Sequence, residues 1–199
     1  IIDALWQFPV KGLGGVTLDE ARLQPGRHFP GDRQFAVTNG HPRNADMAAG
    51  QWRKKALFLQ LMSNERLAAL DCSFSGSRLI ILREGDEHLD ADLDTADGAA
   101  AAGAFFTAFC GDAIAGPATL TRMDAGAFTD TEAAWISLGG TASVAQVATT
   151  FGHLPDARRY RLNVMLKTDT PFEETRLIGH RVALGGAVLR IVEPVGRCA

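Results

Sequence analysis

Residues 67–83 decide the predicted fold class. They read Leu67-Ala-Ala-Leu-Asp71, then a short polar stretch with Gly76, then Arg78-Leu-Ile-Ile-Leu-Arg83. Short apolar runs separated by a turn residue predict two strands. The same reasoning predicts further strands along the chain, at residues 2–8, 17–23, 34–38, 57–62 and 160–167 and as a hairpin-like pair at 181–192. Asn39-Gly40 is the strongest hairpin signal in the sequence.

Two segments have helical periodicity instead. Residues 97–109 place apolar side chains on one face, with Thr95 or Asp97 as the cap and Gly111 just past the end. Residues 141–151 do the same, with Thr141 as the cap and Gly152 as the stop. Strands outnumber helices, so the sequence predicts a mainly β protein with two or three short helices, α+β overall.

Composition limits the classes of function. The chain has 199 residues, and 20 Lys and Arg against 23 Asp and Glu give a net charge of -3. This charge excludes a phosphate-driven nucleic-acid binder. Three widely spaced cysteines, Cys72, Cys110 and Cys198, argue against a disulfide framework and for a reducing, cytoplasmic setting. We see no signal peptide and no apolar run long enough to span a bilayer, and expect no membrane partner.

Several polar residues are candidates for an anion site. Lys11 leaves a predicted strand into Gly12, and Arg33 stands just before the strand at 34–38. Arg161 and Asn163 lie two apart, hence on one face of the strand predicted at 160–167. Each of these residues alone is typical of a solvated surface. Together they suit a phosphate or a pterin pyrophosphate, because Arg offers a bidentate fork and Asn an amide edge.

The segment before the second predicted helix adds to this anion site. Gly139-Gly140 precedes Thr141, so the helix would offer free backbone N–H groups and the positive end of its dipole. The pair of glycines is not a P-loop, since no Lys-Ser/Thr follows it.

Cys198 is the candidate nucleophile or metal ligand. The tail reads Glu193-Pro-Val-Gly-Arg-Cys198, so a strand ends in a Pro/Gly break and a thiol follows Arg197. A neighbouring cation favours the thiolate, which is the form that attacks or binds metal. No CxxC or HxxxH spacing is present, so the sequence has no ordinary zinc signature.

The order of these motifs resembles the MOSC superfamily (molybdenum cofactor sulfurase C-terminal domain). The first part is similar to the β-barrel domain that precedes MOSC. The motifs that carry the resemblance are Phe8-Pro-Val-Lys-Gly12, Gly15-Val16, Gly31-Asp-Arg-Gln-Phe-Ala-Val37, the segment 96–111, Trp135-Ile-Ser-Leu-Gly-Gly-Thr-Ala-Ser143, Arg159-Tyr-Arg-Leu-Asn-Val-Met165, Pro171-Phe-Glu-Glu174, Ile178-Gly-His-Arg181 and Glu193-Pro-Val-Gly-Arg-Cys198. The resemblance implies a β-barrel architecture, with residues 1–123 as the N-terminal domain and 124–199 as the MOSC-like domain.

The resemblance also implies a molybdenum-cofactor or sulfur-handling role. Relatives include reductases of N-hydroxylated compounds, in which the cysteine matching Cys198 ligates the metal or carries a persulfide. The residues that match the family's cofactor-binding set are Lys11, Arg33, Ser137, Thr141, Arg161 and Asn163. A soft thiolate suits molybdenum, and cations with amide donors suit a pterin phosphate.

The sequence departs from the family pattern at several points. Gly12 stands where the family often has a hydroxyl residue, Leu162 replaces a proline, and Val195-Gly196 replaces Cys-Ser. Family members normally continue well past the cysteine, so the resemblance implies a MOSC-like domain truncated at its C-terminus.

Three hypotheses follow. The first is a molybdenum-cofactor oxidoreductase that takes electrons from an external flavin or Fe–S protein, since the sequence has no Fe–S cysteine set and no flavin motif. The second is a protein without redox activity: either a sulfur carrier, with a persulfide on Cys198 supplied by a cysteine desulfurase, or a binding module only. The third is a soluble β-rich domain that has kept the fold and lost the site.

Overall fold

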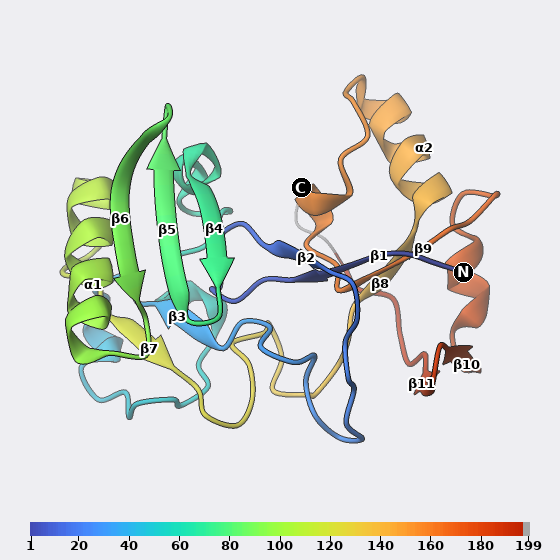
Figure 1. Cartoon of the computed structure of the whole chain (residues 1–199), viewed down its shortest axis with the longest axis horizontal. Helices are drawn as coiled ribbons and strands as arrows, with labels where there is room; N and C mark the ends of the chain where they lie inside the picture. The colour runs from blue at the N-terminus through green and yellow to red at the C-terminus, as the bar shows by residue number, and fades with distance from the viewer. Residues whose placement is uncertain (197–199) are drawn as a thin grey trace. The chain divides into compact units, whose positions relative to one another are not determined.

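The computed structural model describes residues 1–196 and separates the chain into two compact units (Figure 1). Unit 1 contains Ile1–Trp6, Thr17–Pro30 and the stretch from Trp135 onward, and unit 2 contains Gln7–Val16 and Gly31–Ala134. Both units are therefore built from segments that are not contiguous in sequence. The sequence-based division after residue 123 also gave two parts, but as two continuous halves.

Unit 2 is organised around a three-stranded antiparallel sheet covered by one helix. Strands β4 (Asp71–Ser75), β5 (Arg78–Arg83) and β6 (Asp86–Asp92) pair in sequence order. Side chains alternate along β5, so Leu79 and Ile81 are fully buried. Helix α1 (Ala96–Cys110) runs beside β6 and covers this apolar face (Figure 1).

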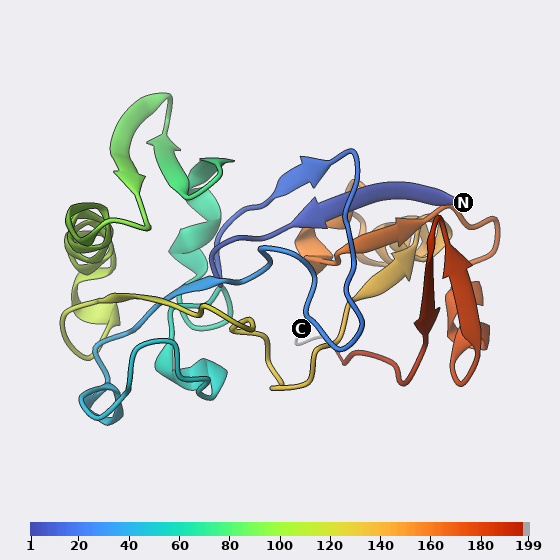
Figure 2. The same cartoon turned by 60° about the horizontal axis from the view of Figure 1, so that its bottom comes forward.

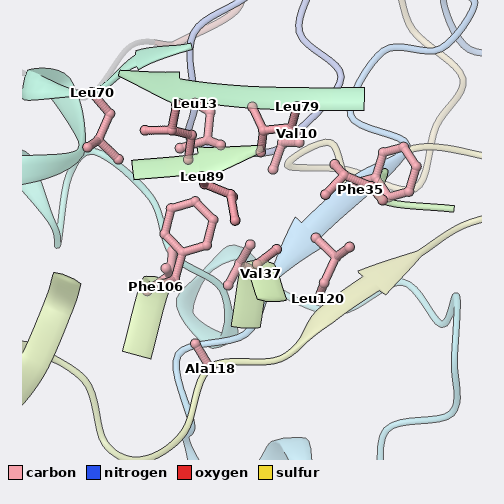
Figure 3. Packing of buried hydrophobic residues seen from close by; sticks show 14 of the residues in the cluster. Val10, Leu13, Phe35, Val37, Leu70, Leu79, Leu89, Phe106, Ala118 and Leu120 are labelled. Carbon is pink, nitrogen blue, oxygen red and sulfur yellow. The ribbon is translucent and has the colours of Figure 1, made fainter. Parts of the chain in front are cut away.

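Helix α1 forms where the sequence places its caps. The Thr95 hydroxyl accepts a hydrogen bond from the Gly98 N–H at 3.0 Å, and the helix ends at Gly111. Its inward face carries Ala102 and Phe106, both with no exposed surface. Phe106 packs among leucines and valines from the sheet and the N-terminal segment (Figure 3), which form the main core of unit 2.

A second, two-stranded sheet completes unit 2. Strand β3 (Phe35–Val37) pairs antiparallel with β7 (Leu120–Arg122), and all three residues of β3 are buried. A parallel bridge joins Val10 to Phe35. Residues 8–13 are thereby held against β3, which fixes the position of Lys11.

A four-stranded sheet lies mainly in unit 1. Its order is β2 (Val16–Leu18), β1 (Ile2–Gln7), β9 (Val164–Leu166) and β8 (Leu138–Gly140). Strand β1 is antiparallel to β9, whereas β8 is parallel to it. Helix α2 (Thr141–Phe151) follows β8 directly, and the return from α2 to β9 makes the crossover that parallel neighbours need.

The C-terminal part of unit 1 forms the predicted hairpin. Strands β10 (Arg181–Leu184) and β11 (Ala187–Arg190) pair antiparallel across Gly185-Gly186 (Figure 2). Short 3-10 helices connect the elements of both units, at Pro42–Asn44, Lys55–Leu57, Glu65–Ala69, Gly111–Ala113, Ala157–Tyr160 and Glu173–Leu177.

The α+β class and both predicted helices are confirmed. The short strands of residues 1–196 are divided among four separate sheets, and no closed barrel is detected among them. The β-barrel architecture that the resemblance implies is therefore not observed. No helix in this part of the chain is long and apolar enough to cross a membrane.

Two predicted strands are wrong. Residues 57–62 make only an isolated bridge between Phe58 and Thr38, and residues 67–71 belong mostly to the 3-10 helix Glu65–Ala69. Their buried apolar residues, Phe58, Leu59, Leu67 and Leu70, pack into the core without a strand ladder. The strand expected at 160–167 begins only at Val164.

Candidate functional site

The structure distributes the predicted site residues over both units. Lys11 and Arg33 belong to unit 2, whereas Ser137, Thr141, Arg161 and Asn163 belong to unit 1. Cys198, the predicted metal ligand and catalytic residue, lies outside the described residues. We therefore describe the polar sites of unit 2 and unit 1 in turn.

Lys11 is a buried cation. Its backbone N–H donates to the Phe35 carbonyl at 2.8 Å, continuing the bridge at Val10, and its side chain is only 8% exposed. The Nζ atom donates to the Phe128 carbonyl at 2.9 Å and to Asp130 Oδ1 at 2.8 Å. A buried ammonium needs such partners, because its charge is otherwise costly to remove from water.

Gly12, the departure from the family pattern next to Lys11, is required by the backbone. Its φ is +85°, and a Cβ at this position would lie 2.8 Å from the Leu59 carbonyl oxygen. A serine here would be strained twice, by the left-handed backbone and by the contact. The turn after Lys11 therefore disfavours any residue with a Cβ at position 12.

Arg33 is held beside Lys11's segment by a carboxylate and an aromatic ring. Its guanidinium pairs with Asp32, and it lies over the Phe8 ring with Cζ 5.2 Å from the ring centroid. Asp32 is 3% exposed and also accepts the Phe8 N–H at 2.8 Å. Arg33 and Asp32 therefore form a largely buried, neutral pair.

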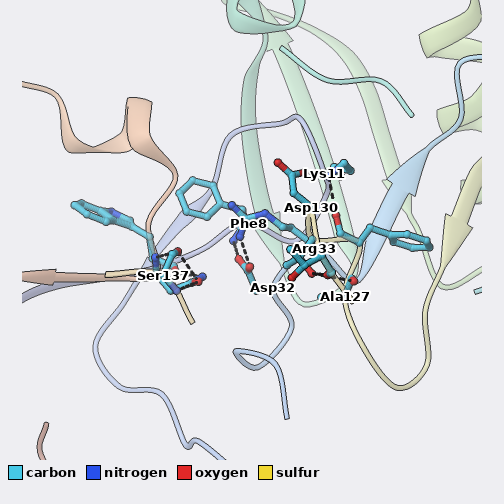
Figure 4. Close-up of polar contacts among 12 residues, drawn as sticks. Phe8, Lys11, Asp32, Arg33, Ala127, Asp130 and Ser137 are labelled. Atoms are coloured by element: carbon cyan, nitrogen blue, oxygen red, sulfur yellow. Dashed lines mark hydrogen bonds and ion pairs between the residues drawn. The ribbon is translucent and has the colours of Figure 1, made fainter. Parts of the chain in front are cut away.

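Asp130 is surrounded by three cations, as Figure 4 shows for Lys11 and Arg33. Its Oδ1 faces Lys11 and its Oδ2 lies 3.7 Å from Lys55 Nζ. Partial burial works to raise the pKa of Asp130, but the hydrogen bond from Lys11 and the charges of Lys11, Lys55 and Arg33 outweigh it and lower that pKa. We call Lys11, Arg33 and Lys55 the cation cluster.

The loop that carries Asp130 is anchored by other groups. The Phe128 N–H donates to the Arg33 carbonyl at 2.8 Å, and Trp52 Nε1 donates to the Thr129 carbonyl at 3.0 Å. The Phe128 ring is fully buried against Phe58. The backbone on either side of Lys11's carbonyl partner is therefore fixed without help from the Asp130 carboxylate.

In unit 1, Ser137 and Asn163 bind each other. Asn163 Oδ1 accepts from the Ser137 hydroxyl at 3.0 Å and from its N–H at 3.3 Å, while the Asn163 N–H donates to Ser137 Oγ at 3.1 Å. Asn163 Nδ2 also donates to the Trp6 carbonyl at 3.3 Å. Asn163 is 2% exposed, so this amide ties β8, β9 and β1 together.

Gly140 is the N-cap of helix α2, and Thr141 is its first residue rather than its cap. The Thr141 hydroxyl donates to the Thr168 carbonyl and accepts from the Thr168 N–H, and the Ala142 N–H donates to the Thr168 hydroxyl. The Ser143 hydroxyl donates to Glu174 at 2.7 Å. A Cβ on Gly140 would lie 2.6 Å from the other Glu174 oxygen, so a carboxylate already lies at this helix end.

Arg161 does not share a strand face with Asn163. It has a left-handed backbone, with φ 51°, and its N–H donates to the Arg158 carbonyl at 3.0 Å. The pattern of alternating side chains applies only from Val164 onward. The predicted pairing of Arg161 with Asn163 by strand alternation is therefore wrong, because a 3-10 turn precedes the strand.

Of the other two cysteines, Cys72 is half-buried and Cys110 is buried. Burial raises the pKa of the Cys110 thiol, and the positive charge of Arg66 offsets this only partly. Within residues 1–196, no group of three or more His, Cys, Asp and Glu side chains is placed to hold a metal ion.

Sequence reasoning found Lys11 and Arg33 but missed Asp130 and Lys55. The Lys11–Asp130 contact spans 119 residues of sequence, and no local motif marks either partner. A comparison with known protein families finds none that matches the chain, and no curated protein matches it.

Lys11 and Lys55 both contact the Asp130 carboxylate, and ammonium groups also bind the oxygen anions of a phosphate. The amide of Asn163 and the hydroxyls of Ser137 and Thr141, in contrast, already have protein partners.

Proposed function

We propose that this chain is a MOSC-type protein that binds a molybdenum cofactor and reduces N-hydroxylated or related N-oxygenated compounds. The observation that carries the proposal is the cation cluster around Asp130. It lies at the positions, Lys11 and Arg33, that match the family's cofactor-binding residues. The ordered motifs between Phe8 and Cys198 support the same assignment.

The charges of the cluster favour an anionic ligand group. Arg33 is paired with Asp32, whereas Lys11 and Lys55 contact Asp130 directly. Removing the counter-ion of Lys11 would be energetically unfavourable, because the ammonium group of Lys11 is buried. In the proposed role, Lys11 and Lys55 bind the cofactor's phosphate. The Arg33 guanidinium lies beside the bound phosphate.

Cys198 has the role of metal ligand in this proposal. Its neighbour Arg197 favours the thiolate. A bound molybdenum cofactor would supply the two-electron chemistry that removes oxygen from the substrate. The chain's three cysteines are too few for an Fe–S cluster held by four thiolates, so electrons would come from a separate flavin or Fe–S protein.

The alternative is a sulfur carrier. The same thiolate character would let Cys198 take a sulfur atom from the persulfide of a cysteine desulfurase, forming a persulfide without any metal. A module that binds the cofactor without catalysis is the third possibility, and the cation cluster is compatible with it as well.

The deciding experiment measures molybdenum and pterin in protein produced in a host that makes the cofactor. We expect both in the unaltered protein and in Cys72→Ser, and a loss of molybdenum in Cys198→Ser. Equal, negligible molybdenum in all three proteins would overturn the proposal. Mass spectrometry after incubation with cysteine and a cysteine desulfurase tests the alternative, which requires a sulfur adduct on Cys198.

A further inference from the structure

The hairpin of β10 and β11 (Figure 1) carries two arginines directly opposite each other, since Arg181 pairs in register with Arg190. We propose that the face of the hairpin with these arginines is a docking site for an acidic, extended segment of a partner protein, whose carboxylate the two guanidiniums bind. The inference goes beyond the proposed function, because it involves neither the cofactor nor any residue of the cation cluster.

The two arginines occupy the closest kind of cross-strand pair. Opposite residues in an antiparallel ladder alternate between hydrogen-bonded and non-hydrogen-bonded pairs, and side chains are closer in the second kind. The Ile191 N–H donates to the His180 carbonyl at 3.0 Å, so the next pair, Arg181 and Arg190, is non-hydrogen-bonded. The Cβ atoms of opposite residues lie about 4.5–5.5 Å apart. Both guanidiniums can therefore reach the same carboxylate.

The two arginines have no counter-charge in the part of the chain that the structure describes. Both side chains are exposed, and neither guanidinium has an ion pair or a hydrogen bond within residues 1–196. The stretch 175–192 contains three arginines and one histidine but no aspartate or glutamate. Like charges directly opposite each other destabilise a strand pair. The hairpin thus carries a local repulsion that a bound anion would relieve.

The two faces of the hairpin differ in their surroundings. Side chains alternate between half-buried and exposed along both strands. Leu184, on the half-buried face, packs against the apolar cluster of unit 1 that contains Val164. Ala183 and Val188 lie on the same face as the arginines and are exposed, Val188 by 66%. The face with the arginines is therefore open to another molecule, while the opposite face holds the hairpin on unit 1.

The spacing of side chains along β11 defines the segment that fits. Val188, Arg190 and Val192 follow one another at every second residue, and all three are exposed. Side chains on one face of a strand are roughly 7 Å apart. An extended partner segment with an acidic residue between two apolar ones, each two positions away, has the same spacing. Its carboxylate would contact the arginines while its apolar side chains cover the valines.

The mixed chemistry of this face favours a protein segment over a nucleic acid. Arginine binds carboxylates through two parallel hydrogen bonds, which suits aspartate and glutamate. A phosphate backbone would contact the arginines and leave Val188 and Val192 in water. The net charge of -3 on the chain also opposes a polyanion.

The test is an NMR titration of the isotope-labelled whole chain with the peptide GVTETVG, blocked at both ends, at fixed ionic strength. The peptide GVTQTVG is the matched probe, because it differs only in lacking the carboxylate. Arg181→Gln and Arg190→Gln each remove one guanidinium, and Arg43→Gln removes an exposed arginine of unit 2 as the control. Circular dichroism verifies that each variant is folded.

We expect the glutamate peptide to shift the amide signals of residues 181–192. Arg181→Gln and Arg190→Gln should each raise its dissociation constant about threefold, and the double variant about tenfold, as for exposed ion pairs. Arg43→Gln should change the dissociation constant less than about twofold. Equal binding of the glutamine peptide, or an unchanged dissociation constant in the double variant, would overturn the inference.

Two further measurements test other occupants of this face. Vesicles of phosphatidylserine and phosphatidylcholine should bind the chain no better than phosphatidylcholine alone. Binding to the anionic vesicles that the double variant loses would assign the face to a membrane instead. Sedimentation should show no self-association that depends on Arg181 and Arg190, and such a dependence would assign the face to a second copy. Either result would overturn the inference.

Thermal melts at low ionic strength test the repulsion itself. Arg190→Gln should raise Tm slightly, because it removes the like-charge pair, although it weakens peptide binding. A residue that only supports the hairpin would instead lower Tm when replaced. A lower Tm in Arg190→Gln would therefore contradict the assignment of this arginine to binding.

Discussion

Asn163 and Ser137 hold each other by reciprocal hydrogen bonds of 3.0 and 3.1 Å where β8 and β9 begin. The Asn163 amide has a further partner in the Trp6 carbonyl of β1. A residue expected to offer its amide edge to a cofactor is thus an internal connection between three strands.

Asn163→Ala should therefore destabilise the protein. It removes the acceptor of the Ser137 hydroxyl and N–H and the side-chain donor to the Trp6 carbonyl, at a site that is 2% exposed, which costs about 2–3 kcal/mol in the free energy of unfolding. Urea unfolding measures this, with the exposed Gln146→Ala as the control. An unchanged midpoint in Asn163→Ala would mean that the amide is free for a ligand.

Gly12→Ser introduces the residue type that the MOSC pattern often has at this position, and it should be harmful here. The left-handed backbone costs about 1–2 kcal/mol for a residue with a Cβ, and the Cβ would also meet the Leu59 carbonyl at 2.8 Å. Gly26→Ser is the matched control, because Gly26 has φ +71° but no atom within 4 Å of the added Cβ.

Comparing the thermal melts of the two variants separates the effect of the contact with the Leu59 carbonyl from the effect of the left-handed backbone, which both glycines share. We expect Gly12→Ser to lower Tm clearly more than Gly26→Ser. Equal losses would show that the carbonyl of Leu59 moves aside, and the steric reason against a Cβ at position 12 would then be wrong.

Thr95→Ala should cost about 1 kcal/mol of stability, because it removes the cap of helix α1. The Thr95 hydroxyl accepts the Gly98 N–H and donates to the Asp92 carbonyl, which ends β6. Thr95→Ser keeps the hydroxyl and should restore most of the loss in urea unfolding. A serine variant as unstable as the alanine variant would point to the methyl group instead.

The helices were predictable because their signals are local. Thr95, Gly111 and Gly152 each lie at a helix end and act through neighbours within one turn. Strand prediction failed where burial had another origin, as in residues 57–62. Strand β6 was missed although Leu89, Ala91 and Leu93 alternate with acidic residues, a pattern that predicts a half-buried strand.

The candidate site was only partly predictable, because its contacts join residues that lie far apart in the sequence. Lys11 and Arg33 stand next to recognisable turns in the sequence. Asp130, the counter-ion of Lys11, comes from a loop 119 residues after Lys11, and the packing of Phe128 against Phe58 helps to hold that loop in place. No sequence pattern marks a contact that depends on a buried ring.

The lowered pKa of Asp130 predicts how stability depends on pH. Because the pKa is lower in the folded than in the unfolded chain, this carboxylate stabilises the fold above its unfolded pKa of about 3.9, and the contribution is lost as pH falls through the folded value. Asp130→Asn should be less stable than the unaltered protein at pH 7, and the difference should shrink below about pH 4.

Urea midpoints between about pH 3 and pH 7 measure this difference. Asp124→Asn serves as the control, since Asp124 is largely exposed and pairs only with the half-exposed Arg122 among the contacts described for it. A difference between the unaltered protein and Asp130→Asn that stays constant down to the lowest pH would contradict the assigned ion pair with Lys11.

The thiols should differ in their rates of alkylation. Burial raises the pKa of Cys110, the last residue of α1, and its side chain lies in the core of unit 2, so iodoacetamide should modify it slowest at about pH 8. Cys72 is half-buried and should react faster.

Cys198, beside Arg197 in sequence, should react fastest if its thiolate is favoured as proposed. Peptide mass spectrometry over a time course gives the three rates, and a rate for Cys198 no higher than that for Cys72 would remove the reason for treating it as the reactive thiol.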